Sequence, residues 1–153
     1  AFHTLVTRPD IRAATWIRDN TTAEARFLVN SFSIYAGSSI VGSDGGWWLP
    51  LLAGRQTTVP PLNYSSEQGP TPDYRAQVNE LAQLVQERGP TDEQVIALLR
   101  QAGVTHVYIG QRQGRVNYDG PVALDPEALL AQPDYDLQYH QDRVWIFALK
   151  ARD

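Results

Sequence analysis

Apolar residues recur at helical spacing in three segments of the chain, residues 8–20, 73–88 and 91–103. The predicted apolar faces are Ile11, Ala14 and Ile17 in the first helix and Val78, Leu81, Leu84 and Val85 in the second. Thr91 is the predicted hydroxyl cap of the third helix, and Gly103 closes it in the left-handed conformation. A fourth, shorter helix is predicted for DPEALLAQ, where proline occupies the first turn.

Strand patterns lie between these helices. The apolar run RFLVNSF predicts a buried strand near residues 26–31, residues 55–59 predict a second, and VTHVYIG predicts a third directly after Gly103. YDLQYH and RVWIFAL flank Gln141-Asp142 and predict an antiparallel hairpin. The Ser- and Gly-rich residues 31–46 predict an irregular crossover.

Strands that alternate with helices predict an α/β fold. We expect a three-layer α/β/α arrangement with a mainly parallel central sheet and a C-terminal antiparallel hairpin. The length of 153 residues and the 42% hydrophobic content fit a single folded domain over residues 1–153.

Charge and composition narrow the possible partners. The net charge is −4 and the 13 basic residues are spread along the chain, which gives no footprint for nucleic acid. The longest apolar candidate, residues 47–53, contains Pro50 and is far shorter than the roughly 20 residues that span a bilayer. The absence of cysteine excludes disulfides and thiolate sites. The chain has no methionine and opens on Ala1, which predicts a fragment of a longer protein.

The sequence gives little indication of a catalytic site, a metal site or a cofactor-binding site. His3, His106 and His140 have no partner at ligand spacing, so we expect no metal site and satisfied histidines. The glycines of residues 37–46 match neither a dinucleotide fingerprint nor a phosphate-binding loop, so no cofactor is expected. The pairs Asp10/Asp19 and Asp134/Asp136 are interpreted as caps or solvated charges, and no catalytic residue is predicted.

The segment GSDGGWWLPLLAGRQT, residues 42–57, is the predicted ligand or partner surface. Adjacent residues in an extended segment point in opposite directions, so one indole is expected to fill the core and the other to face outward. In the structural alternative the segment plugs the core and the Arg55 guanidinium pairs with a carboxylate. In the two functional alternatives, the outward indole binds a sugar, or it contacts the membrane interface or a membrane-embedded part of the protein outside this sequence. The surface comprises Asn30, Asp44, Trp47, Trp48, Arg55 and Tyr64.

Four segments together resemble a known kind of protein: WIRDNTTAEARFLV, GGWWLPLLAGRQT, LLRQAGVTHVYIG and YDLQYHQDRVWIFAL. From about Ala13 to Leu149, the chain resembles the C-terminal soluble region of bacterial polytopic membrane proteins related to the C-type integral-membrane glycosyltransferases. The resemblance implies an extracytoplasmic domain tethered through a membrane-embedded part of the same chain. In that superfamily the catalytic acid lies in the membrane part, so none is carried onto this sequence.

The resemblance favours a non-catalytic accessory domain of a glycosyltransferase-like membrane protein, serving assembly or acceptor contact. Its expected partner is the membrane-embedded part of the same chain, with a glycan or lipid-linked sugar as a further ligand. A carbohydrate-binding module that uses the Trp47/Trp48 region is the alternative, and an independent soluble enzyme is the third hypothesis.

Overall fold

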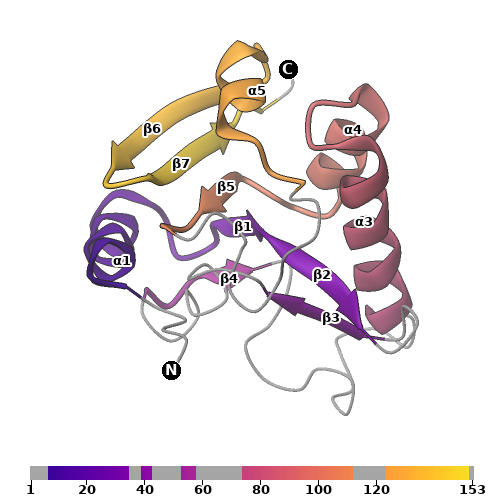
Figure 1. Cartoon of the computed structure of the whole chain (residues 1–153), viewed down its shortest axis with the longest axis horizontal. Coiled ribbons are helices and arrows are strands. Elements are labelled where there is room, and N and C mark those ends of the chain that lie inside the picture. The colour runs from indigo at the N-terminus through magenta and orange to yellow at the C-terminus, as the bar shows by residue number, and fades with distance from the viewer. Residues whose placement is uncertain (1–6, 35–38, 43–52, 58–73, 112–122, 152–153) are drawn as a thin grey trace.

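The computed structural model describes residues 7–34, 39–42, 53–57, 74–111 and 123–151 of the chain. Figure 1 shows how helices and strands alternate along them, which confirms the α/β class. In chain order the elements are α1 (Arg8–Asn20), β1 (Arg26–Val29), β2 (Ser31–Ile34), β3 (Ser39–Gly42), β4 (Gln56–Thr57), α3 (Tyr74–Arg88), α4 (Glu93–Gln101), β5 (His106–Ile109), α5 (Pro126–Ala131), β6 (Tyr135–Gln141) and β7 (Val144–Leu149).

Within the described residues, five strands form one mixed sheet in the order β4-β1-β5-β7-β6. Strand β1 runs parallel to β4 and β5, whereas β7 runs antiparallel to both β5 and β6. The predicted C-terminal hairpin is therefore confirmed. The sheet is parallel only at one end, in place of the mainly parallel sheet predicted, because the hairpin adds directly to β5.

The turn of the β6–β7 hairpin lies one residue later than the sequence predicted. Asp142 and Arg143 both have positive φ, at 51° and 69°. A two-residue hairpin turn of type I′ needs positive φ at both central residues, and its twist matches the twist of the two antiparallel strands that it joins. Asp142 and Arg143 thus occupy the two central positions of the turn, where glycine is often found.

A second, two-stranded sheet pairs β2 with β3 in antiparallel register, from Ser31 opposite Gly42 to Ile34 opposite Ser39. The prediction of an irregular crossover was wrong for these eight residues. Serine and glycine are weak strand formers, so their composition hid the pairing. Helix α3 contacts both strands of this hairpin.

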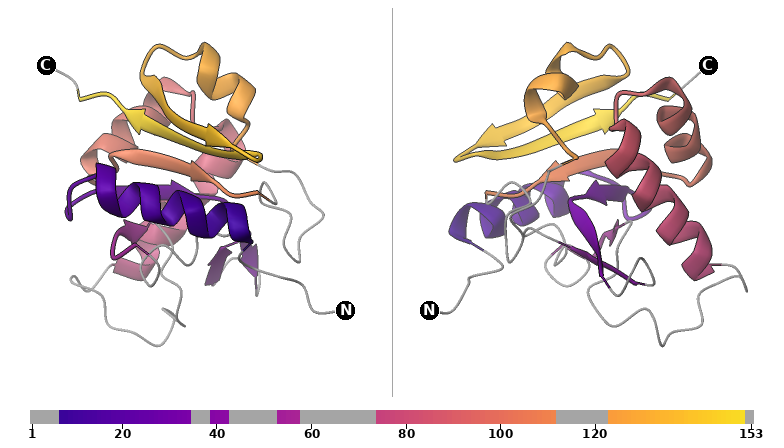
Figure 2. Two further views of the ribbon diagram at one scale, coloured as in Figure 1. Left: turned by 90° about the vertical axis from the view of Figure 1, so that its left-hand side faces the viewer. Right: turned by 45° about the vertical axis from the view of Figure 1, so that its right-hand side comes forward.

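Alternate residues of the strands face two separate hydrophobic clusters. Phe27, Tyr108 and Ile146 pack with α1 through Ala13, Ala14 and Ile17. Leu28, Val107 and Phe147 instead pack with residues from α3, α4 and α5, among them Val85, Leu99 and Leu129. Figure 2 shows α1 nearest the viewer from one side and α3 nearest from the other.

Helix α1 buries a different face from the one its apolar pattern predicted. Ala14 and Ile17 are buried as expected, but Ala13 and the acidic Asp10, which were not predicted to be buried, are buried with them. Ile11, predicted to lie in the core, is 51% exposed. Part of the apolar surface of α1 is therefore exposed and does not pack in the core.

Caps define the helix ends. Thr7 caps α1, and a reciprocal capping box joins it to Asp10. Asp92, not the predicted Thr91, caps α4 by accepting from the backbone N–H groups of Gln94 and Val95. Gly103 follows α4 with φ of 78°, which confirms the left-handed position predicted there.

Candidate functional site

The carboxyl ends of the parallel strands form the edge of the sheet where α/β folds most often place ligands. Strand β1 ends at Val29 and β5 at Ile109, and they lie side by side because Val29 pairs with Tyr108. Asn30 directly follows β1 and is 3% exposed. Polar groups at this edge are therefore the first candidates for chemistry.

A buried carboxylate belongs to this edge. Asp10, in the first turn of α1, is 1% exposed. Its Oδ2 accepts from the N–H of Thr7 at 3.0 Å and from Thr7 Oγ1 at 2.8 Å. Its Oδ1 accepts from the hydroxyl of Tyr108 at 2.5 Å and from the N–H of Gln111 at 3.2 Å. Four donors thus hold one carboxylate, and two of them come from β5 and the residues that follow it.

The Asp10 contacts join the start of α1 to the end of β5. The sequence left Asp10 as a cap or a solvated charge; the structure places it in the capping box with Thr7, and its bond to Tyr108, 98 positions away, was missed. The spacing of Thr7 and Asp10 is that of a capping box, a signal in the sequence for the local half of the network. No local pattern indicates the tyrosine.

Arg55 lies just before β4 and binds the other end of α1. Its guanidinium donates to the carbonyl oxygens of Arg18 and Thr21 at 3.1 and 2.9 Å, to Thr21 Oγ1 at 2.9 Å, and to the Ala53 carbonyl at 3.1 Å. These carbonyls include the unpaired acceptors of a helix C-terminus, which favour a cation. Within the described residues the partners of Arg55 are carbonyl and hydroxyl oxygens, in place of the predicted carboxylate.

The structure describes two of the six residues of the predicted ligand surface, and it does not bring them together. Arg26 pairs with Gln56, so Arg55 lies beside Ala25 at the amino end of the parallel strands. Asn30 lies five residues further along β1, roughly 16 Å away at about 3.3 Å per residue. Asp44, Trp47, Trp48 and Tyr64 lie outside the described residues.

His106 has local partners that account for it. A 2.7 Å hydrogen bond joins its Nδ1 to Thr105 Oγ1, and its ring stacks on Phe27 with the centroids 4.9 Å apart. Burial lowers the pKa of His106 below its usual value of 6.5. Within the described residues, no group of three or more His, Asp or Glu side chains is placed to hold a metal ion.

The lowered pKa of His106 predicts an acid-side loss of stability. His106 therefore takes up a proton more readily in the unfolded chain than in the folded one. Through this residue, the free energy of unfolding is highest above about pH 6.5 and declines as the pH falls below that value. Urea unfolding from pH 7 to pH 5 should show a steeper fall in unfolding free energy for the wild type than for His106→Gln. Equal slopes for the two proteins would contradict this assignment.

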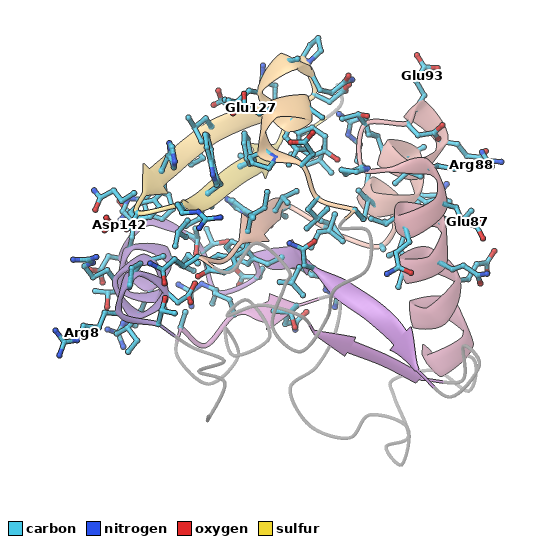
Figure 3. The ribbon with its side chains drawn as sticks, viewed as in Figure 1. Arg8, Glu87, Arg88, Glu93, Glu127 and Asp142 are labelled. Carbon is cyan, nitrogen blue, oxygen red and sulfur yellow. The ribbon has the colours of Figure 1, made fainter. Side chains whose placement is uncertain are left out.

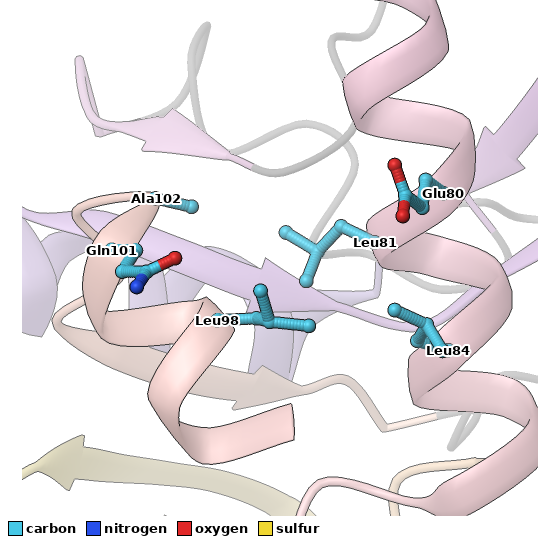
Figure 4. Close-up of a pocket in the computed structure, with 6 residues that line it drawn as sticks. All are labelled: Glu80, Leu81, Leu84, Leu98, Gln101 and Ala102. Carbon is cyan, nitrogen blue, oxygen red and sulfur yellow. The ribbon is translucent and has the colours of Figure 1, made fainter. Parts of the chain in front are cut away.

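An open groove lies between α3 and α4 (Figure 4). It has a volume of about 330 Å³, and Leu81 and Leu84 of α3 face Leu98 of α4 and Ala102, which follows α4, across it. Glu80 and Gln101 complete its lining. The groove is largely apolar and brings together no pair of titratable groups among these six residues.

No protein family, curated protein or solved structure gives a significant match to this chain. Among the described helices, none is both long enough and apolar enough to cross a bilayer.

Proposed function

We propose that this chain is a non-catalytic accessory domain of a larger membrane protein related to the C-type integral-membrane glycosyltransferases. In this proposal it lies on the extracytoplasmic face of the membrane and serves assembly or acceptor contact. Its partner is the membrane-embedded part of the same chain.

The observation that carries the proposal is that the buried carboxylate of Asp10 is hydrogen-bonded by groups of the fold itself. Asp10 lies at the sheet edge where an α/β enzyme would place an acid or a base. A general acid or base must reach the proton that it transfers, and it needs a hydrogen-bonding position for the substrate. Both oxygens of Asp10 instead accept two donors each from the fold, at 1% exposure. This carboxylate is best explained as part of the scaffold.

Arg55 supports the same interpretation at the opposite end of α1. A guanidinium is a common means of holding a phosphate or a carboxylate. Here its three nitrogens bind the last turn of α1 and the preceding Ala53 carbonyl. Asp10 and Arg55 thus hold both ends of one helix against the sheet, and their charges serve the position of α1.

We also infer the three-layer arrangement expected from the sequence. The cluster with α1 takes alternate strand residues from one face of the sheet, and the cluster with α3, α4 and α5 takes those from the other. Such a scaffold presents helix surfaces outward on both sides, which suits contacts with other parts of a protein.

Co-purification tests the proposal. The tagged 153-residue chain would be co-expressed with the membrane-spanning segments encoded upstream in its own reading frame, and an unrelated tagged domain of similar size would serve as the control. We expect the membrane part to be retained by this chain in mild detergent and not by the control. Elution of the chain alone, or sugar transfer from a lipid-linked donor by the purified chain, would count against the proposal.

A further inference from the structure

Helix α1 presents one continuous outer face. Arg8, Ile11, Arg12, Thr15 and Arg18 are all exposed, and their spacing of three or four residues places them in one stripe along the helix. We call these five residues the α1 face. The opposite side of the helix carries the buried Asp10, Ala13, Ala14 and Ile17.

The α1 face is cationic although the whole chain carries a net charge of −4. Arg12 is paired at 2.6 Å with Asp142 of the β6–β7 turn. Neither Arg8 nor Arg18 has a carboxylate partner among the described residues. Arg143 of the same turn and Asp19 are also exposed. Among the described residues of α1 and this turn, four exposed arginines therefore lie with two exposed carboxylates, Asp19 and Asp142.

Apolar groups accompany these arginines. Ile11 is 51% exposed, the highest exposure among the large hydrophobic side chains of the described residues. On the side of the face toward the β6–β7 hairpin, Trp16 and Tyr139 are half-buried, with their ring centroids 5.4 Å apart. Arginine, an exposed aliphatic side chain and amphipathic aromatic rings are the combination that favours a membrane interface.

We propose that the α1 face docks on an anionic lipid surface, with the arginines at the phosphate headgroups and Ile11 inserted beside them. Charge alone would fit any polyanion. The exposed isoleucine favours a bilayer over a nucleic acid or a polysaccharide, because the bilayer offers an apolar interior in which burial of the side chain adds to binding. This inference depends on α1 and its neighbouring turn, and it does not require the proposed parent protein.

Figure 3 shows why a matched control is available. Arg8 projects outward from α1 on the same side of the molecule as Asp142, whereas Glu87, Arg88 and Glu93 lie on the opposite side. Arg88 and Lys150 are exposed, so a double substitution there removes the same two charges from other surfaces.

Vesicle co-sedimentation tests the proposal on the whole 153-residue chain. The vesicles are phosphatidylcholine alone or phosphatidylcholine mixed with phosphatidylglycerol, in about 0.1 M and about 1 M salt, where the screening length falls from about 10 Å to about 3 Å. We expect binding to the anionic vesicles in low salt, weak binding to phosphatidylcholine, and loss of the difference in high salt.

Each arginine near an anionic surface changes the partition about fivefold, so Arg8→Gln with Arg18→Gln should lower it roughly 25-fold. Ile11→Ser should lower it about fivefold in either salt, because its contribution is apolar. The control pair Arg88→Gln and Lys150→Gln should stay within about twofold of the wild type. All three variants carry their substitutions at exposed positions, and thermal unfolding of each protein verifies that it is folded.

Three results would overturn the proposal. The first is equal binding of the wild type to both kinds of vesicle, or binding to neither. The second is an equal loss in the α1 and control pairs, which would show an effect of net charge alone. The third is binding to a soluble polyanion such as heparin without binding to vesicles.

Discussion

Asp10→Ala should lower the free energy of unfolding by about 3 kcal/mol or more, because each buried donor that loses its acceptor costs about 1–3 kcal/mol. The substitution removes an acceptor from the Tyr108 hydroxyl, whose bond is buried, and from the N–H groups of Thr7 and Gln111, whose bonds are partly buried. Urea denaturation at pH 7 measures the change directly. Asp19→Ala, at an exposed position of the same helix, should stay within about 0.5 kcal/mol of the wild type.

The Asp10→Ala result also separates a scaffold carboxylate from a functional one. Groups kept for chemistry often cost stability, and their removal then leaves the fold unchanged or more stable. A loss below about 1 kcal/mol would therefore contradict the structural role given to Asp10. Tyr108→Phe should cost about 1–2 kcal/mol, and the double variant should cost less than the two single losses together.

Arg55→Met should cost about 2 kcal/mol, the second largest effect expected here. The substitution keeps much of the side-chain volume but removes the donors from the Arg18 and Thr21 carbonyls at the end of α1. Since those carbonyls terminate the helix, hydrogen exchange should quicken in its last turn before it changes in the sheet.

Arg18→Met is the matched control for Arg55→Met. The Arg18 side chain is exposed, and only its backbone carbonyl takes part in the contact with Arg55. This variant should stay within about 0.5 kcal/mol of the wild type. Equal losses in the two variants would show that loss of positive charge, rather than the bonds to the helix end, determines the effect.

Much of the fold could be predicted because helices and buried strands leave local patterns. The strand of residues 106–109 and the helix of residues 74–88 were predicted within three residues at each end, as was the hairpin of residues 135–149. Hydrophobic periodicity and turn residues are sufficient for such elements. The pairing of β7 with β5 depends on contacts between residues about 40 positions apart, for which the sequence has no local signal.

The candidate site was harder to predict for the same reason. Asn30 and Arg55 were grouped as polar side chains that could bind a ligand beside the two tryptophans, but Asn30 follows β1 and Arg55 precedes β4. Parallel pairing then places them at opposite edges of the sheet. The partners of Arg55 were missed because backbone carbonyls at a helix end have no signature in the sequence of the residue that binds them. The proposed surface at Trp47 and Trp48 stays a prediction.

Ile11 was predicted to lie in the core, but it is exposed on the outer face of α1. An apolar residue at helical spacing was assigned to the core, but Asp10 occupies the buried side through its bond to Tyr108 and turns Ile11 outward. That rotation creates the mixed cationic and apolar α1 face.

The reading frame upstream of the Ala1 codon in the source genome tests the central claim most directly. Sequencing it requires no assumption about substrate or partner. If the chain is an accessory domain of a membrane protein, the frame should continue upstream into several hydrophobic segments of about 20 residues each. A start codon within a few residues of Ala1, with no such segments in the frame, would contradict the claim.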